Sequence, residues 1–262
     1  MSSPAWQEPY DAHAASYARF LDPTLAGAVE RLVELAGARP GMRLLDLATG
    51  TGTAAQAAAK RGASVVGIDL SPGMLEVARG RSPEIDFRLA DACALPVDGG
   101  AFDAVTCGLC LSHFGEREKA LREVLRVLRK EGLFVASTWG EGGSDPTAPV
   151  GEILERYAGA VEGLDEETWL SPERGREILR EAGFASVSVE TELFTGSFGD
   201  AEEALAWSLA WPLSATRLGR LDSRRCQRFL ADAREAIANS DLSWNFAFNF
   251  FVACRPEVRG RS

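Results

Sequence analysis

The feature that most constrains the fold is a glycine-rich turn, LLDLATGTGTAA at residues 44–55. The preceding run MRLLDLA, at 42–48, is short and apolar, which is typical of a buried parallel strand. The segment TAAQAAAKRG, at 53–62, predicts an alanine-rich helix closed by a glycine. A strand that turns through glycines into a helix presents backbone N–H groups at the helix start. The sequence therefore predicts a ligand site at this turn.

The alternation of apolar runs and helical segments continues after the turn. Further strands are expected at 63–70, 84–90, 101–107 and 132–139, with helices that begin after Ser71-Pro72 and over 116–130. Five strands that alternate with helices predict a doubly wound parallel α/β sheet of the Rossmann-like type.

The flanking regions predict helical material around this core. Residues 9–37 suggest one or two amphipathic helices with a break at Asp22-Pro23, and 150–182 and 200–240 are also helical in pattern. The runs 184–194 and 244–255 suggest two more strands. We expect N-terminal lid helices at 1–39, a ligand-binding core at 40–140, and a helical substrate cover with the final strand pair at 141–262. The cover falls at about 141–183 and 200–240.

Composition limits the function classes. A net charge of −10 and a pI near 4.9 oppose binding to a polyanion, so nucleic acid is not an expected partner. The chain has no apolar run of 18 residues and no basic n-region followed by an apolar stretch, which favours a cytoplasmic protein. Its five cysteines are an odd number and predict reduced thiols rather than a disulfide framework.

The glycine turn alone leaves two ligand classes open. Gly50-x-Gly52-x-x-Ala55, with Asp69 at the end of the next strand, also matches a dinucleotide fingerprint. Asp46, however, lies four positions before Gly50, where a carboxylate would repel a pyrophosphate. S-adenosylmethionine carries cationic ammonium and sulfonium groups, which a carboxylate favours directly or through a water. Alternatively, Asp46 only fixes the turn by accepting backbone N–H bonds.

Several blocks together resemble the class I S-adenosylmethionine-dependent methyltransferases, closest to the small-molecule type that includes quinone-biosynthesis enzymes. The blocks are LLDLATGTG, VVGIDLSPGML, DACALPVDGGAFDAVTCGLCLSHF and LRVLRKEGLFVAS, with a weaker echo in YDAHAASYARFLDP. They cover roughly residues 40–140. The resemblance implies a seven-stranded sheet whose last strand is antiparallel, and S-adenosylmethionine as cofactor with S-adenosylhomocysteine as product.

The resemblance also implies roles for individual residues. Gly50 and Gly52 would approach the methionine portion of the cofactor, Asp69 would take the ribose hydroxyls, and Leu70 and Met74 would flank adenine. Further cofactor contacts are implied at Asp46, Ala48, Asp91, Ala92, Cys107, Gly108 and Tyr17, with Tyr10 as an alternative to Tyr17. For Asp69 and Asp91 a helix cap or a solvated carboxylate is the alternative, and for Met74 it is core packing.

Candidates for proton transfer are the two histidines, His113 after the fourth strand and His13 on the lid helix. In-line positioning and exclusion of water drive much of methyl transfer, so a base is not essential. Cys107-x-x-Cys110 ends a strand and has no second pair, so we expect neither redox chemistry nor a metal site. The tryptophans and phenylalanines at 139, 169, 198, 207, 211 and 244 are mostly core residues, although a few could line an apolar pocket for an aromatic or polyketide-like acceptor.

We therefore expect a methyltransferase that acts on an oxygen, nitrogen or carbon nucleophile of a small metabolite. Natural-product biosynthesis is one context for such a reaction, and a monomer or homodimer is expected. Two alternatives remain. A cyclase or binding module could use the same cofactor site, because the motifs specify only that site. An NAD-dependent dehydrogenase would retain Asp69 but leaves Asp46 unexplained, and the chain lacks a Tyr-x-x-x-Lys pair.

Overall fold

A seven-stranded sheet forms the centre of the computed structural model, which describes residues 4–161 and 170–257. Its strands run in the order β3-β2-β1-β4-β5-β7-β6, and β7 alone is antiparallel to its neighbours. The strands are β1 (Arg43–Leu47), β2 (Ser64–Asp69), β3 (Asp86–Leu89), β4 (Phe102–Gly108), β5 (Leu128–Trp139), β6 (Ser186–Ser197) and β7 (Ser243–Cys254). The predicted Rossmann-like sheet with an antiparallel last strand is confirmed.

Helices cover both faces of this sheet because each central strand alternates its apolar side chains between two cores. Leu44 joins the core under α2 and α3, whereas Leu45 and Leu47 join the core under α5 and α7. The helices are α1 (Pro4–Ser16), α2 (Asp22–Leu35), α3 (Thr53–Lys60), α4 (Pro72–Arg81), α5 (Arg117–Val127), α6 (Ala148–Ala158), α7 (Pro172–Glu181), α8 (Ala201–Ala210), α9 (Pro212–Gly219) and α10 (Ser223–Ile237). None of the helices in the described part of the chain is long and apolar enough to span a membrane.

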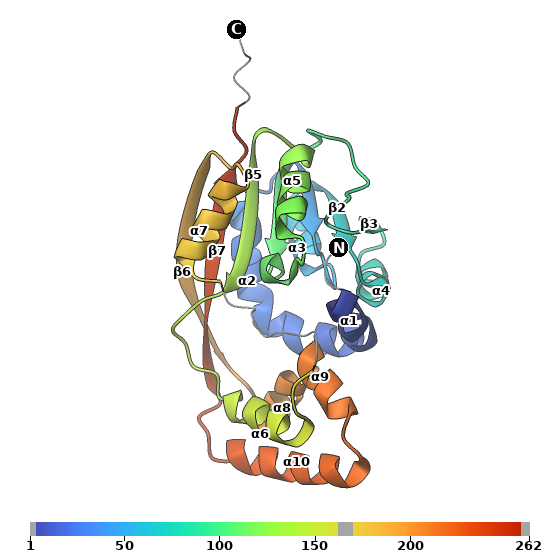
Figure 1. Ribbon diagram of the computed structural model, residues 1–262, viewed down its shortest axis with the longest axis vertical. Helices are drawn as coiled ribbons and strands as arrows, with labels where there is room; N and C mark the ends of the chain where they lie inside the picture. Colours follow the sequence, from blue (N-terminus) through green and yellow to red (C-terminus); the bar gives the residue numbers. More distant parts are fainter. Residues whose placement is uncertain (1–3, 162–169, 258–262) are drawn as a thin grey trace.

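Four helices gather at one end of the sheet, the lower end in Figure 1. Three of them, α8, α9 and α10, form the insertion between β6 and β7, and α6 packs against them. We call α6, α8, α9 and α10 the cap. Helix α1 contacts both α9 of the cap and α4 of the core, so the N-terminal segment lies between the two.

The N-terminal region is more continuous than the sequence suggests. The predicted break at Asp22-Pro23 coincides with the start of α2, but the backbone stays helical there, because α1 passes through a π-helical turn (Tyr17–Leu21) directly into α2. Pro23 is tolerated since it lies in the first turn of α2, where its missing N–H is not needed. The Asp22 carboxylate accepts hydrogen bonds from Thr51 and Arg81 and so ties this joint to the glycine turn and α4.

Helix α5 is also shorter than predicted. It ends at Val127, and residues 128–130 already belong to β5 instead of extending the helix to 130. Leu128 is fully buried and pairs with Phe102, while Glu131 has a φ of +59° beside an irregularity in the β4–β5 register. Basic residues are favoured in the last turn of a helix, and Arg129 and Lys130 therefore look like a helix end in the sequence. In the structure they already belong to β5.

Asp46 is a buried carboxylate in the centre of β1 that fixes the start of the glycine turn. One oxygen accepts from the Thr49 hydroxyl at 2.6 Å and from the Ala55 N–H at 3.1 Å, and the other accepts from Thr106 of β4 at 2.7 Å. Burial raises the pKa of Asp46 to about 6, although these three hydrogen bonds act in the opposite direction.

Helix α1 is held against α4 by a capping interaction. The Asp11 carboxylate accepts from the Ser71 hydroxyl and from the Gly73 N–H at 2.9 Å, at the N-terminus of α4. Gly73 permits this contact, since a Cβ there would lie 2.6 Å from the Asp11 carbonyl oxygen.

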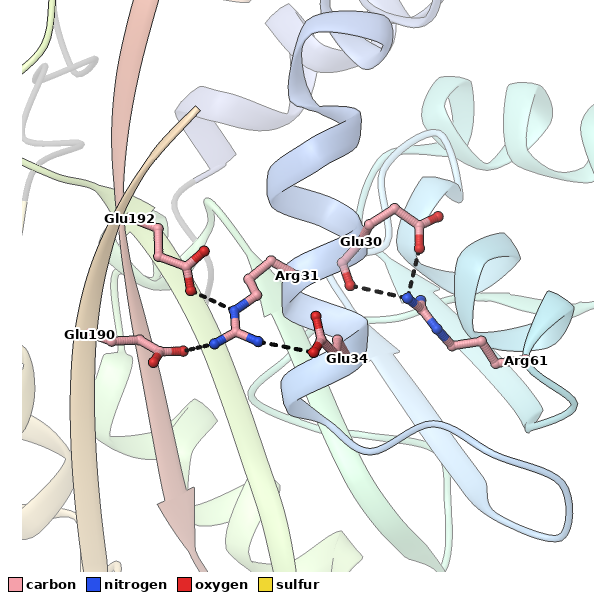
Figure 2. Close-up of polar contacts among 6 residues, drawn as sticks. All are labelled: Glu30, Arg31, Glu34, Arg61, Glu190 and Glu192. Carbon is pink, nitrogen blue, oxygen red and sulfur yellow. Dashed lines mark hydrogen bonds and ion pairs between the residues drawn. The ribbon is translucent and has the colours of Figure 1, made fainter. Parts of the chain in front are cut away.

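On the opposite side of the molecule, ion pairs connect α2 to the edge strand β6 (Figure 2). Arg31 pairs with Glu190 at 2.8 Å and with Glu192 at 2.5 Å, and it also reaches Glu34 of its own helix. These side chains are partly exposed, so each ion pair adds little stability. The charges on β6 also disfavour pairing of this edge strand with another chain.

A pair of helical glycines provides a test of the packing. A Cβ at Gly175 in α7 would overlap the buried Phe251 ring, whereas a Cβ at Gly80 in α4 meets no atom within 4 Å. We expect Gly175→Ala to lower the free energy of unfolding by about 1–3 kcal/mol, and Gly80→Ala to raise it by about 0.5–1 kcal/mol. Urea denaturation measures both, and equal effects would contradict the packing of α7 on β7.

Asp46 predicts a pH dependence of stability. Its pKa of about 6 lies above the ordinary value of 3.8, so the folded state retains a proton that the unfolded chain releases. Stability from this group is therefore lost as the pH rises from about 4 to about 6, by about 3 kcal/mol in total. Asp46→Asn should remove this loss, because an amide does not titrate in this range, and the amide NH2 can donate to the Thr106 hydroxyl so that the contact is kept. Parallel stability profiles for the two proteins between pH 4 and 7 would contradict this assignment.

Candidate active site

A cavity of about 720 Å³ lies over the carboxyl ends of the parallel strands. Residues at or just after the carboxyl ends of four strands form its floor: Ala48, Gly50, Leu70, Ala92 and Gly108. Side chains of α1 and of the cap form its walls and roof. Open α/β sheets bind their ligands at this position, so the cavity is the candidate active site.

The two glycines of the turn, Gly50 and Gly52, have different surroundings. At Gly50, with φ of +54°, a Cβ would meet no atom within 4 Å, so this residue faces open space. At Gly52, with φ of +82°, a Cβ would lie 3.0 Å from Ala78 and from Phe87. Gly50 thus leaves room for a ligand, whereas Gly52 permits close internal packing and does not line the cavity.

Asp69 joins the ends of β1 and β2 at the cavity floor. One of its oxygens accepts from the Gly50 N–H at 2.8 Å, and the other accepts from the Ser71 N–H at 2.9 Å. Burial raises the pKa of this carboxyl, while the backbone N–H groups lower it. The Leu70 N–H also bonds to this carboxylate. A carboxylate can accept about four hydrogen bonds, so a ribose hydroxyl could donate to Asp69 without breaking these three.

The remaining cofactor candidates divide between the cavity and the protein interior. Leu70, Met74, Ala92, Gly108, Ala48 and Tyr17 line the cavity. Asp91 does not line it, and its carboxylate accepts from the Cys93 N–H at 2.8 Å. Cys107 is fully buried, and its hydrogen bond with Cys110 raises the pKa of its thiol well above the usual range.

Asp46 lies beneath the turn and reaches a second, small cavity of about 70 Å³. Ala48, Gly50 and Gly108 line both cavities, so the two adjoin at the glycine turn. The turn, Asp69 and the apolar Leu70, Met74 and Ala92 together fit a cofactor with a ribose, a flat base and a cationic amino acid end.

The two histidines differ in position. His113 lines the cavity, and its ring packs 4.7 Å from that of Trp6. Burial lowers the pKa of His113 to about 4, so the imidazole is neutral at physiological pH. His13, on α1, does not line the cavity, and its catalytic role stays a prediction.

Aromatic rings form a continuous wall on the cap side. Trp211 contacts Tyr17, Trp139 and Trp207 at ring-centre distances of 5.6–6.0 Å, and Trp207 stacks on Phe246 at 5.3 Å. All five of these rings line the cavity, whereas Phe198 and Trp244 do not. Trp169 lies outside the described residues. Trp207 is buried in the core and also lines the cavity, so a core role and a pocket-lining role, which the sequence offered as alternatives, are combined in one residue.

The cap and the loop before α6 also supply polar lining residues that the sequence does not single out. Thr147, Ser208 and Arg217 are buried, and Asp145, Glu152 and Glu155 are exposed at the rim. Periodicity places Ser214 and Arg217 on one helix face, but it cannot say which face meets the cavity. Trp6 and Gln7, ahead of the first predicted helix, line the cavity as well.

Comparison with known proteins shows the family to which the chain belongs. Residues 45–136 match the family model described as a methyltransferase domain. The demethylmenaquinone methyltransferase of Renibacterium salmoninarum is 46% identical over 127 residues, 48% of this chain and 52% of that protein. That of Thermus thermophilus is 38% identical over 191 residues, 63% of this chain and 83% of that protein.

Solved structures share the fold. The YcgJ protein of Bacillus subtilis has a TM-score of 0.58 at 19% identity, over 88% of this chain and 99% of that one. The phosphoethanolamine N-methyltransferase 2 of Haemonchus contortus, in complex with S-adenosylmethionine, has a TM-score of 0.56 at 22% identity, over 94% and 57%. With its glycine turn, its Asp69 and its relatives, this chain belongs to the class I S-adenosylmethionine-dependent methyltransferases, and S-adenosylmethionine is its cofactor.

Proposed function

We propose that this enzyme methylates an oxygen, nitrogen or carbon nucleophile of a compact, aromatic, quinone-type small molecule. One observation carries the proposal: a single cavity joins the cofactor floor at Gly50 and Asp69 to the aromatic wall around Trp211. Flat apolar acceptors gain both burial and ring contacts on such a wall. The names of the demethylmenaquinone methyltransferase relatives support a quinone-type acceptor.

The bound cofactor supplies an electrophilic methyl group on a sulfonium. The protein has to align the acceptor in line with the methyl–sulfur bond and exclude water. Trp6, Tyr10 and Tyr17 reach the cavity from the N-terminal segment, and Trp207 and Trp211 reach it from the cap. We propose that residues 1–39 act as lid helices and that the cap covers the acceptor, over the cofactor-binding core at 40–140.

We also propose a setting for the reaction. A net charge of −10 favours a small molecule over nucleic acid as partner, and the proposed setting is the cytoplasm. Natural-product biosynthesis is the proposed context, with the enzyme as a monomer or homodimer.

Two measurements test the proposal. Calorimetric titration with S-adenosylhomocysteine and with NAD should give binding of the first alone. Mass spectrometry of hydroquinone and phenol candidates, incubated with S-adenosylmethionine, should show the gain of one methyl group. Cofactor binding without methylation of any aromatic acceptor would favour a cyclase or a binding module, and binding of NAD would favour a dehydrogenase.

Asp69 predicts a loss of cofactor affinity. Asp69→Asn removes the charge that would accept the ribose hydroxyls, so S-adenosylhomocysteine should bind about 10–100-fold more weakly. Asp91→Asn is the matched control, because Asp91 does not line the cavity. Calorimetry measures both constants. An equal loss of affinity in the two variants would show that Asp91 also contributes to cofactor binding and would contradict a specific role of Asp69.

His113 predicts a specific loss of turnover. If its neutral imidazole accepts the acceptor's proton, His113→Ala should lower kcat by at least about 100-fold with cofactor affinity retained. A base must be unprotonated, and the pKa of His113 is about 4, so activity from this group is present at pH 6–8 and lost below about pH 4. His113→Phe keeps a ring against Trp6. Full activity in this variant would show that His113 contributes packing alone.

A further inference from the structure

Two cysteines meet where β4 ends at the cavity. Cys107 is the last residue but one of this strand, and Cys110 follows it after the turn Gly108-Leu109. Leu109 has a φ of +53°, a conformation that leucine rarely adopts, and its N–H donates to the Ser137 carbonyl of β5 at 3.0 Å. The turn brings the Cys110 thiol into hydrogen-bond contact with the Cys107 thiol. We call Cys107 and Cys110 the thiol pair.

The two thiols differ in their access to the cavity. The chain has five cysteines, all within the described residues, and of these Cys110 alone lines the cavity, whereas Cys107 is fully buried. The contact with Cys110 and burial raise the pKa of the Cys107 thiol, so Cys107 stays protonated and can donate to the Cys110 sulfur. An accessible thiol beside a buried, protonated one suits disulfide chemistry, in which the accessible sulfur reacts first and the buried sulfur completes the disulfide.

The cavity supplies a reason for such chemistry that the sequence does not. From the sequence, redox chemistry is not expected, because the pair ends a strand and has no helix N-terminus to activate it. A quinone, however, is both a strong electrophile and an oxidant of thiols. Its electron-poor ring cannot attack a sulfonium, whereas the corresponding hydroquinone is a nucleophile at oxygen and at ring carbon. A methyltransferase that meets its acceptor as a quinone therefore needs a two-electron reductant before methyl transfer.

We propose that the thiol pair reduces a quinone-type acceptor to its hydroquinone within the cavity, so that methyl transfer can follow. This proposal rests on the proposed function and adds a redox step to it. The Cys110 sulfur bonds to a ring carbon beside one carbonyl, and the electron pair of the ring double bond moves towards the other carbonyl. The Cys107 sulfur then attacks the Cys110 sulfur. The disulfide bond forms, the carbon–sulfur bond breaks, and its electron pair completes the hydroquinone ring, while the two thiol protons pass to the two quinone oxygens.

The charge balance of this step suits an acidic cavity. Four carboxylates line the cavity, and they disfavour a ligand that gains negative charge: Asp69, Asp145, Glu152 and Glu155. In the proposed step two electrons leave the thiol pair together with two protons, so neither the protein nor the acceptor changes its net charge.

Tyr10 adds a hydrogen-bond donor on the same side of the cavity. It lines the cavity and lies close enough to Cys110 to interact with it electrostatically. Burial raises the pKa of the Tyr10 phenol, so its hydroxyl keeps its proton at physiological pH. A donor beside Cys110 can polarise a quinone carbonyl and so favour attack by the Cys110 sulfur.

Single-turnover reduction by the full chain tests the proposal. Reduced protein, freed of added reductant and kept under argon, is mixed with 2,3-dimethyl-1,4-naphthoquinone, whose substituted ring carbons cannot form a stable aromatic thioether. We expect one hydroquinone per chain by absorbance and a disulfide between Cys107 and Cys110 by peptide mass spectrometry. Cys110→Ser and Cys107→Ala should each abolish both signals. Cys226→Ser, on α10, removes a thiol that does not line the cavity and should leave both signals intact.

Urea denaturation shows whether the variants fold. If Cys107→Ala does not, Cys110→Ser decides, because Cys110 is only half-buried. Absence of hydroquinone from the unaltered enzyme, or reduction that survives Cys110→Ser, overturns the proposal.

Methyl transfer separates this proposal from the proposed function. The enzyme receives S-adenosylmethionine with either 2-methyl-1,4-naphthoquinone or its hydroquinone, and no other reductant. We expect a methylated product from both, and we expect Cys110→Ser to lose the product from the quinone. Methylation of the hydroquinone but not of the quinone by the unaltered enzyme overturns the redox step and leaves the proposed function standing. Failure to methylate the hydroquinone would instead contradict the proposed function.

Discussion

The carboxylate of Asp69 is the contact on which the site depends. It accepts from the backbone of the β1 turn and from the start of α4, so two separate strand–helix connections share one anchor. Asp46 does the same one strand inward, since it joins β1 to α3 and to β4. Neither carboxylate replaces a hydrophobic core. Each instead satisfies backbone donors that a buried turn would otherwise leave unpaired, and the floor is rigid as a result.

The walls of the site are built differently from this floor. The floor consists of backbone and short side chains at strand ends, whose positions follow from the sheet. The walls consist of aromatic and charged side chains on helices that precede β1, follow β5 or interrupt the final strand pair, together with Trp139 and Phe246 from the sheet. Strands β6 and β7 pair with each other over twelve residues, and the helices α8, α9 and α10 connect them at one end of the pair. The cap can therefore differ between relatives while the cofactor floor remains the same.

How much the sequence could predict follows this division. The strands, the glycine turn and Asp69 are local patterns with fixed spacing, so they could be predicted, and the helix pattern at 200–240 marked the cap. Arg217, Ser208 and Thr147 could not be predicted as site residues, because periodicity shows that a helix has faces but not which face meets the ligand. The end of α5 could not be predicted for another reason. Residues 128–130 continue the helical pattern of the sequence, but Leu128 pairs with Phe102 of β4 and so belongs to β5.

The carboxylates around the turn also bear on the end of the catalytic cycle. Asp46 and Asp69 interact electrostatically, and Asp11 lies close enough to Asp69 to raise its pKa. Their combined negative charge would favour a bound sulfonium over the neutral thioether that remains after methyl transfer. S-adenosylhomocysteine would thus lack an electrostatic attraction that S-adenosylmethionine has. The charge of the floor would thereby lower the affinity for S-adenosylhomocysteine relative to S-adenosylmethionine, and the methyl transfer itself would promote release of the product.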